Sequence, residues 1–150
     1  MIIVYHCYGG THSSVTAAAL HLKKLHQNPT ANDLLKLPLF DKVNAADWGR
    51  LFYHGKDCYG NLVYTMGRGK RFKLIEMFYQ SLLEVCPEGT IKEVVFIDTL
   101  PYVNMKMRIG GFLSRHLGFV YLGRPLTAIG TLEILPNIRK KVNEILDSCK

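Results

Sequence analysis

The chain has 150 residues, 48% of them hydrophobic, and a formal net charge of +7. This length and apolar content can fill one core without disulfides or metal, so we expect a single domain over residues 1–150. The apolar start, Met1 to Val4, is too short to span a membrane and lacks a basic leader, which predicts a cytoplasmic protein with no membrane partner.

Cysteine usage and charge distribution narrow the functional classes. Cys7, Cys58, Cys86 and Cys149 show neither disulfide-type nor zinc-type spacing, so we expect free thiols and no metal site. Lysines and arginines are spread along the chain rather than gathered in a tail. That distribution fits a small phosphorylated ligand as well as nucleic acid.

The first third of the chain predicts a strand, a tight turn and a helix. Ile2 to His6 reads as a buried strand, and Ser13 to His26 has apolar residues at helical spacing. A short helix over Asn32 to Leu37 is stopped by Pro38, and Asp41 to Asp47 reads as loop.

The middle third predicts a hairpin followed by a helix. Arg50 to His54 and Leu62 to Met66 are β-rich runs joined by a glycine-bearing loop. The basic loop Gly67 to Arg71 then leads into an amphipathic helix over Phe72 to Cys86, whose apolar face we expect to point inward.

The last third predicts two more strands, each followed by a helix. Glu93 to Ile97 is a buried strand, and Val103 to Leu117 is a helix. Phe119 to Leu122 reads as a strand that enters the turn Gly123-Arg124-Pro125, and Leu132 to Leu146 reads as the last helix.

Strands alternating with helices predict an α/β fold. We expect a mainly parallel sheet in a three-layer arrangement, with helices on both faces and an inserted antiparallel hairpin. Ligands bind such sheets at the carboxyl ends of the strands. Three loops should meet there, namely Cys7 to Ser13, Asp98 to Tyr102 and Gly123 to Thr127.

The glycine-rich turn after the first strand is the main candidate site. Its glycines let the backbone approach a ligand, and the following helix offers N–H groups and a positive dipole end to a phosphate-like anion. The same field favours the reactive thiolate of Cys7. The predicted anion-binding residues of this turn are Gly9, Gly10, Thr11, His12, Ser13 and Ser14. Alternatively, the glycines only make a tight turn, Ser13 caps the helix, and Cys7 is a small buried hydrophobe.

Three residues farther along the chain are candidates to assist. Asp98, at a strand end, suits a general acid, although it could equally cap the next helix or pair with an arginine. Arg108 could reach an anion from its helix, or it could simply be solvated. Arg124, held in a turn, could clamp a phosphate through two hydrogen bonds.

His6-Cys7, five residues and then Ser13-Ser14 resemble the phosphate loop of cysteine-dependent phosphatases, which has His-Cys, five residues, arginine, and serine or threonine. Ser13 stands at the arginine's position. By this resemblance, phosphatase activity would require Arg108 or Arg124 to take over that arginine's role.

The spacing Cys7-x-x-Gly10-x-x-Ser13-Ser14 also resembles the phosphocysteine loop in the B components of sugar phosphotransferase systems, which need no arginine there. That resemblance implies a phosphate-accepting Cys7. A nucleotide site of the Walker type is disfavoured because His12 stands near the lysine's place and no Gly-Lys-Ser/Thr occurs. We therefore expect no cofactor, and magnesium only together with a bound nucleotide.

Five segments together are similar to an uncharacterised protein family of endospore-forming Firmicutes. They are Tyr5-His6-Cys7-Tyr8-Gly9-Gly10, His12-Ser13-Ser14, residues 98–104, residues 107–113 and Gly123-Arg124-Pro125. The resemblance covers nearly the whole chain. It implies a bacterial, cytoplasmic protein and transfers no catalytic residue.

The sequence leaves three functions open. The leading hypothesis is a protein that binds a phosphate ester or nucleotide, with Cys7 as nucleophile if it is a phosphotransfer enzyme or phosphatase. The competing hypothesis is a noncatalytic regulatory or interaction module that senses a small anion or binds a protein. The third is nucleic-acid binding through Arg68, Lys70 and Arg71.

Overall fold

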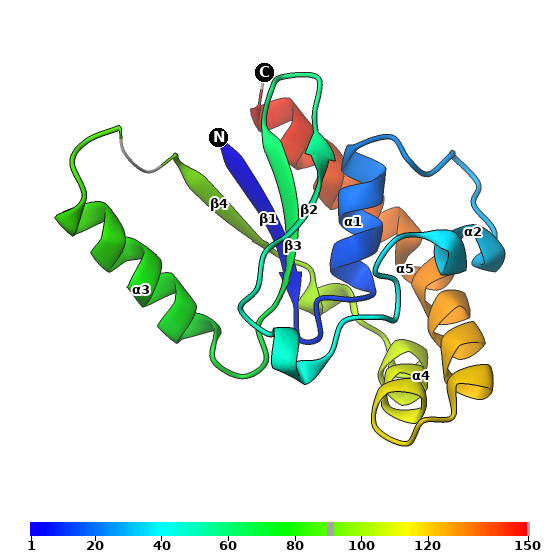
Figure 1. Ribbon diagram of the computed structural model, residues 1–150. Helices are drawn as coiled ribbons and strands as arrows, with labels where there is room; N and C mark the ends of the chain where they lie inside the picture. The colour runs from blue at the N-terminus through cyan, green and yellow to red at the C-terminus, as the bar shows by residue number, and fades with distance from the viewer. Residues whose placement is uncertain (90–91, 150) are drawn as a thin grey trace.

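The computed structural model describes residues 1–89 and 92–149 (Figure 1). Within these ranges the chain forms a four-stranded sheet, five α-helices and two short 3₁₀ helices. The strands are β1 (Ile2–Cys7), β2 (Phe52–Lys56), β3 (Leu62–Gly67) and β4 (Val94–Asp98). The helices are α1 (Ser13–His21), α2 (Ala31–Lys36), α3 (Phe72–Val85), α4 (Met105–Arg115) and α5 (Val120–Ser148), with η1 (Ala45–Asp47) and η2 (Leu100–Tyr102).

The strand order β2-β3-β1-β4 confirms the predicted fold class. β1 is parallel to both of its neighbours, whereas β2 pairs antiparallel with β3 as the predicted hairpin. Cys7 lies opposite Gly67 of β3, and His6 lies opposite Asp98 of β4. The carboxyl ends of three strands therefore meet at one edge of the sheet.

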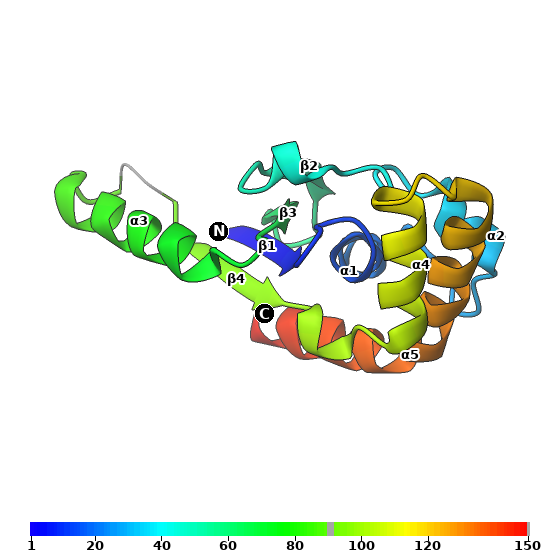
Figure 2. The same ribbon diagram turned by 90° about the horizontal axis from the view of Figure 1, so that it is seen from below.

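Alternate residues of β1 serve the two faces of the sheet. Ile3 and Tyr5 belong to the core that α1 and α5 cover, while the ring of His6 stacks on Phe72 of α3 at 4.1 Å between centroids. Figure 2 shows α1 and α5 on one side of the sheet and α3 on the other. Helices thus lie on both faces, as the predicted three-layer arrangement requires.

Helix α1 ends five residues earlier than the sequence predicts. Lys23 adopts a positive φ of 54°, the left-handed conformation that commonly terminates a helix. Its N–H donates to the carbonyl of Leu20, and the N–H of Lys24 donates to that of Ala19. These two bonds satisfy the last carbonyls, so the apolar spacing up to His26 does not extend the helix.

The predicted strand over Phe119 to Leu122 and the turn Gly123-Arg124-Pro125 are wrong. Helix α5 begins at Val120 and runs through both segments. A Cβ atom on Gly123 would lie 2.5 Å from the carbonyl oxygen of Gly110 on α4. This glycine therefore allows two helices to pack closely, a role that a glycine before a proline does not reveal in the sequence.

The prediction that the apolar face of α3 points inward is confirmed only in part. No residue of α3 is fully buried. The helix meets the sheet through Phe72 and Tyr79, whose rings contact that of Phe96 at 5.7 and 5.6 Å between centroids. The Tyr79 hydroxyl also accepts the N–H of Val94 at 2.9 Å. Other apolar side chains of α3 remain exposed.

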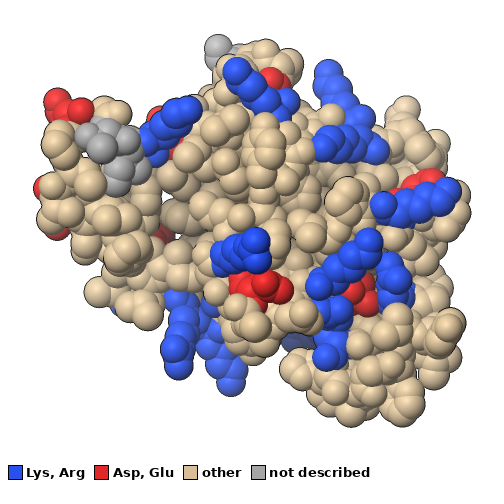
Figure 3. Space-filling model, in the orientation of Figure 1, with Lys and Arg blue, Asp and Glu red and all other residues tan. Residues whose placement is uncertain are grey.

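Charged side chains are spread over the surface. On the face shown in Figure 3, lysines and arginines form several small groups, some beside acidic side chains. This agrees with the absence of a basic tail in the sequence. None of the helices in the two described ranges is both long enough and apolar enough to cross a membrane.

Candidate functional site

A cavity of about 600 Å³ opens at the carboxyl end of β1. The β1–α1 turn, the segment 43–48, η2 and α4 supply its walls. Two arginines and two histidines line it: Arg108, Arg115, His12 and His116. Among the described residues, no aspartate or glutamate contributes to the lining. The cavity is therefore suited to an anion.

Cys7 is one of the residues that line this cavity, and its side chain is held by two neighbours in the turn. The thiol is 4% exposed and accepts the N–H of Gly10 at 3.2 Å. The hydroxyl of Ser14 lies 3.4 Å from Sγ, within hydrogen-bond distance for sulfur. The two contacts fix the position of the sulfur within the turn.

The two glycines of the turn have different roles. Gly10 has a φ of 69°, and a Cβ there would lie 2.2 Å from the backbone nitrogen of Gly67 on β3. Gly9 lines the cavity, and a Cβ there would meet only Thr11, at 3.6 Å. Gly10 is thus required for the turn to pack against β3. This is the structural role that the tight-turn alternative assigned to both glycines.

His12 is paired with a buried carboxylate. Its Nε2 lies 2.9 Å from Oδ1 of Asp41, whose side chain is 1% exposed. The hydroxyl of Ser114 donates to the same oxygen at 2.9 Å. Asp41 was predicted only as part of a loop. The one available signal was its place between the apolar residues Phe40 and Val43.

Thr11 holds the loop that carries Asp41. Its hydroxyl donates to the carbonyl of Leu39 at 2.7 Å and accepts the N–H groups of Lys42 and Val43 at 2.9 and 3.3 Å. Leu39 and Asp41 both have positive φ angles, 68° and 55°. The conformation of this loop is therefore strained and is fixed by the residue that sequence analysis assigned to anion binding.

Ser13 connects the turn to the end of β4. The hydroxyl of Thr99 donates to the carbonyl of His6 at 2.9 Å, so the Ser13 hydroxyl must donate to Thr99 Oγ1, also at 2.9 Å. The alternative in which Ser13 caps the helix is wrong, because His12 occupies the N-cap position of α1 and Ser13 is the first helical residue. Ser13 nevertheless lines the cavity.

Two of the three predicted assisting residues lie outside this cavity. Arg108 contributes to its lining, but Arg124 and Asp98 do not, among the residues that the structure describes. Arg124 lies on α5, where its Nε is 3.8 Å from Oδ2 of Asp41. Asp98 accepts a hydrogen bond of 2.8 Å from Nη2 of Arg68. Of the roles considered for Asp98, the structure thus shows the pairing with an arginine.

His6 lies on the opposite face of β1 from Cys7. Burial lowers its pKa from 6.5 to about 4; Asp98 opposes this shift and Arg68 adds to it. Its Nδ1 is buried without a hydrogen-bond partner in the structure and lies 3.7 Å from Oδ1 of Asp98. The ring is therefore neutral at pH 7 and packs on Phe72.

Arg115 and Trp48 are wall residues that sequence analysis missed. Arg115 donates from Nη1 to the carbonyl of Asp41 at 2.9 Å and from Nη2 to that of Val43 at 2.7 Å. The ring of Trp48 contacts Tyr8 edge-on at 5.1 Å between centroids. Helical spacing places Arg115 on the same face as Arg108 and Gly111, which was the available signal for it. A lone tryptophan in a loop gives no such sign.

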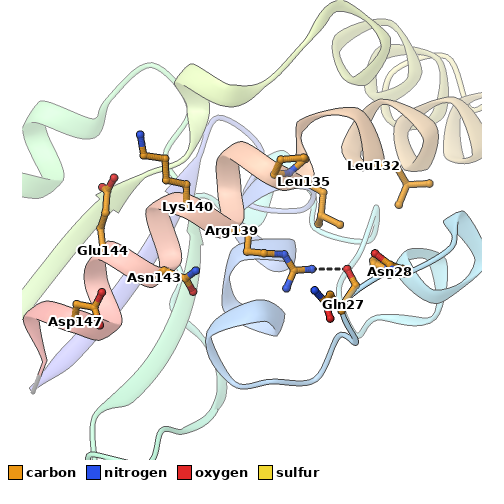
Figure 4. Close-up of a pocket in the computed structure, with 11 residues that line it drawn as sticks. Gln27, Asn28, Leu132, Leu135, Arg139, Lys140, Asn143, Glu144 and Asp147 are labelled. Carbon is orange, nitrogen blue, oxygen red and sulfur yellow. Dashed lines mark hydrogen bonds between the residues drawn. The ribbon is translucent and has the colours of Figure 1, made fainter.

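A second, shallower hollow of about 1020 Å³ lies between α5 and the segment 27–29 (Figure 4). Arg139 donates to the carbonyl of Gln27 at 2.9 Å across it. Its lining mixes Arg139 and Lys140 with Glu144 and Asp147, and it contains no predicted site residue. The cavity at Cys7 is therefore the better candidate for an anion. Within the described ranges, no group of three or more histidine, cysteine or acidic residues is arranged to hold a metal ion.

The chain belongs to the family described as "Protein of unknown function (DUF3189)", which matches residues 2–146. No curated protein and no solved structure matches the chain.

Proposed function

We propose that this member of the DUF3189 family binds a phosphate ester in the cavity at Cys7 and transfers its phosphoryl group to the thiol. One observation carries the proposal. Cys7, whose sulfur accepts a backbone N–H and contacts a hydroxyl, lines a cavity that also has two arginines and two histidines in its walls. Such surroundings favour both a thiolate and a phosphate.

The proposed first step forms a bond between the Cys7 sulfur and phosphorus as the phosphorus–oxygen ester bond breaks. The leaving oxygen takes its proton from His12, whose ring is oriented by the Asp41 carboxylate at 2.9 Å. In the second step water attacks the phosphocysteine while His12 takes up the water's proton. Inorganic phosphate leaves, and the thiolate is restored.

Arg108 is the proposed replacement for the arginine that the phosphatase-type loop lacks, because it lines the cavity whereas Arg124 does not. His12 is a better placed acid than Asp98, which is engaged with Arg68. Ser13 and Thr11 would position the turn rather than contact the phosphate, since their hydroxyls already have partners.

Turnover of an aryl phosphate tests this proposal. We expect hydrolysis by the wild-type protein, trapping of a phosphoryl adduct by rapid acid quench and intact-mass measurement, and loss of both in Cys7→Ser. The matched control is Cys58→Ser, because Cys58 is also a free cysteine but is exposed on the β2–β3 loop. Hydrolysis that persists in Cys7→Ser would overturn covalent catalysis.

A noncatalytic anion sensor is the second candidate. It is favoured by the low exposure of the Cys7 thiol and by Ser13 at the arginine's position. A ligand at about a hundred times its dissociation constant should stabilise the protein by roughly 2.7 kcal/mol. Equal stabilisation of wild type and Cys7→Ser by phosphate, without turnover, would select this candidate.

The proposed setting is the bacterial cytoplasm. All four cysteines are free, which fits a reducing compartment. The ligand is proposed to be a small phosphorylated molecule or a nucleotide, with magnesium entering only together with a nucleotide.

A further inference from the structure

Helix α3 carries two separate apolar stripes. The first comprises Phe72, Ile75, Tyr79, Leu82 and Cys86, all partly buried on the side that meets the sheet. The second comprises Leu74, Met77, Phe78 and Val85, exposed to 61, 57, 64 and 77%. At 100° per residue the second stripe lies roughly 120° around the helix from the first. The packing within the chain therefore uses only one of the two stripes.

The exposed stripe is flanked by charges of opposite sign at its two ends. Lys73 lies beside its beginning and Glu84 beside its end, on the same flank by helical spacing. Both side chains are exposed, and within residues 1–89 and 92–149 neither makes an ion pair within the chain.

We infer that the exposed stripe of α3 is the interface between two copies of this chain, with the two α3 helices antiparallel about a two-fold axis. An antiparallel pair brings the same flank of each helix together, so Lys73 of each copy would face Glu84 of the other. Such a surface is complementary to itself, which is the requirement for a two-fold interface. A parallel pair would instead bring opposite flanks of the two helices together, so Lys73 of one copy would not face Glu84 of the other.

The position of α3 in the molecule leaves room for this partner. Figures 1 and 2 both show α3 at one margin, away from α1, α2, α4 and α5. Among the described residues, none of α3 lines the cavity at the glycine-rich turn. The inference is independent of the function proposed for Cys7.

Sedimentation equilibrium of the full chain over a range of concentrations tests the interface. We expect a reversible dimer for the wild type and about thirtyfold weaker association for Phe78→Glu, which places two carboxylates in the apolar contact. Gln27→Glu is the control, since it adds the same charge at an exposed position away from α3. Far-ultraviolet circular dichroism would verify that both variants fold. A wild-type monomer at all concentrations, or a dimer unchanged by Phe78→Glu, would overturn the inference.

A charge swap tests the antiparallel orientation. Lys73→Glu and Glu84→Lys should each weaken the dimer, because each places like charges together across the axis. The double variant Lys73→Glu/Glu84→Lys should restore wild-type association, because the opposed charges return in exchanged positions. Failure of the double variant to recover would rule out antiparallel pairing.

Discussion

The two ends of helix α1 carry the same kind of pair in opposite surroundings. At the beginning, His12 bonds to Asp41 at 2.9 Å, and its ring also lines the cavity. At the end, His21 bonds to Asp57 at 3.1 Å, and its other ring nitrogen bonds to the Tyr5 hydroxyl at 2.8 Å. Both ring nitrogens of His21 are therefore occupied, whereas His12 presents part of its ring to a ligand.

The comparison teaches that a histidine–carboxylate pair is a candidate for catalysis or binding only where it borders a cavity. The interior pair is closed, because the side chains of His21 and Asp57 are 0 and 1% exposed. A buried pair of this kind contributes to stability mainly through the penalty for losing one partner. At the cavity, in contrast, the His12 ring has open space beside it as well as its carboxylate partner.

Gly10→Ala should have the largest effect, at the cavity end. The added Cβ would overlap the backbone of Gly67 and would be strained at positive φ, so we expect a loss of about 4 kcal/mol in unfolding free energy. Urea unfolding measures this loss. Gly9→Ala is the control and should change stability by less than about 0.5 kcal/mol. Equal losses in the two variants would contradict the separate roles of the glycines.

His21→Ala should be next, at the interior end. The variant leaves the Asp57 carboxylate and the Tyr5 hydroxyl without their common partner, and we expect a loss of about 3 kcal/mol. This value is at the low end for a broken buried pair because Asn61 and Tyr59 still donate to Asp57. Phosphate affinity measured by calorimetry well below the melting temperature should not change.

Asp41→Asn tests whether the carboxylate at the cavity end of α1 contributes to anion binding. The amide keeps the shape of the carboxylate but removes the negative charge beside His12, so inorganic phosphate should bind about tenfold more weakly. Asp57→Asn is the same substitution at the interior end, and it should lower stability without changing that affinity. If both variants bind phosphate like the wild type, the cavity pair takes no part in anion binding.

Acid should destabilise the protein in two separate ranges of pH. Burial lowers the pKa of both His6 and His54 from 6.5 to about 4, with Asp98 opposing and Arg68 adding at His6, and Lys24 adding at His54. Near pH 6.5 the unfolded chain takes up protons on these two histidines, whereas the folded chain does not. The stability that the neutral rings contribute is therefore fully present above pH 6.5 and is lost as the pH falls to about 4.

The stability contributed by the His21–Asp57 pair should be lost only at lower pH. Burial opposes ionisation of Asp57, but hydrogen bonds led by those from Asn61 and His21 outweigh it and hold the Asp57 pKa below 3.8. Its contribution is therefore present above pH 3.8 and lost below. Thermal melts should show both ranges, and His54→Gln should flatten only the upper one. A melting temperature that is constant between pH 7 and 4 would contradict this account.

The parts of the fold that were predicted correctly rest on local patterns. β1, the β2–β3 hairpin and β4 are short apolar runs bounded by glycine or polar residues. The start of α5 was mistaken for a strand because Phe119 to Leu122 is also a short apolar run before a glycine and a proline. Its helical form is set by packing on α4, and a pattern of four residues does not contain that information.

The candidate site was predicted where it is local in sequence and missed where it is assembled in space. Cys7, Gly9, His12 and Ser13 come from one turn and all line the cavity. Asp41 joins them from 29 residues away through its bond to His12. Only the folded chain brings such distant groups together.

The hydroxyl of Thr11 offers a way to observe the site without a substrate. The amide groups of Lys42 and Val43 donate to this one oxygen atom. Their hydrogens can exchange with solvent deuterium only when the turn and the loop separate. Exchange rates at these two amides would therefore time the opening of the cavity wall, and a ligand that bridges the turn and the loop would slow both amides together.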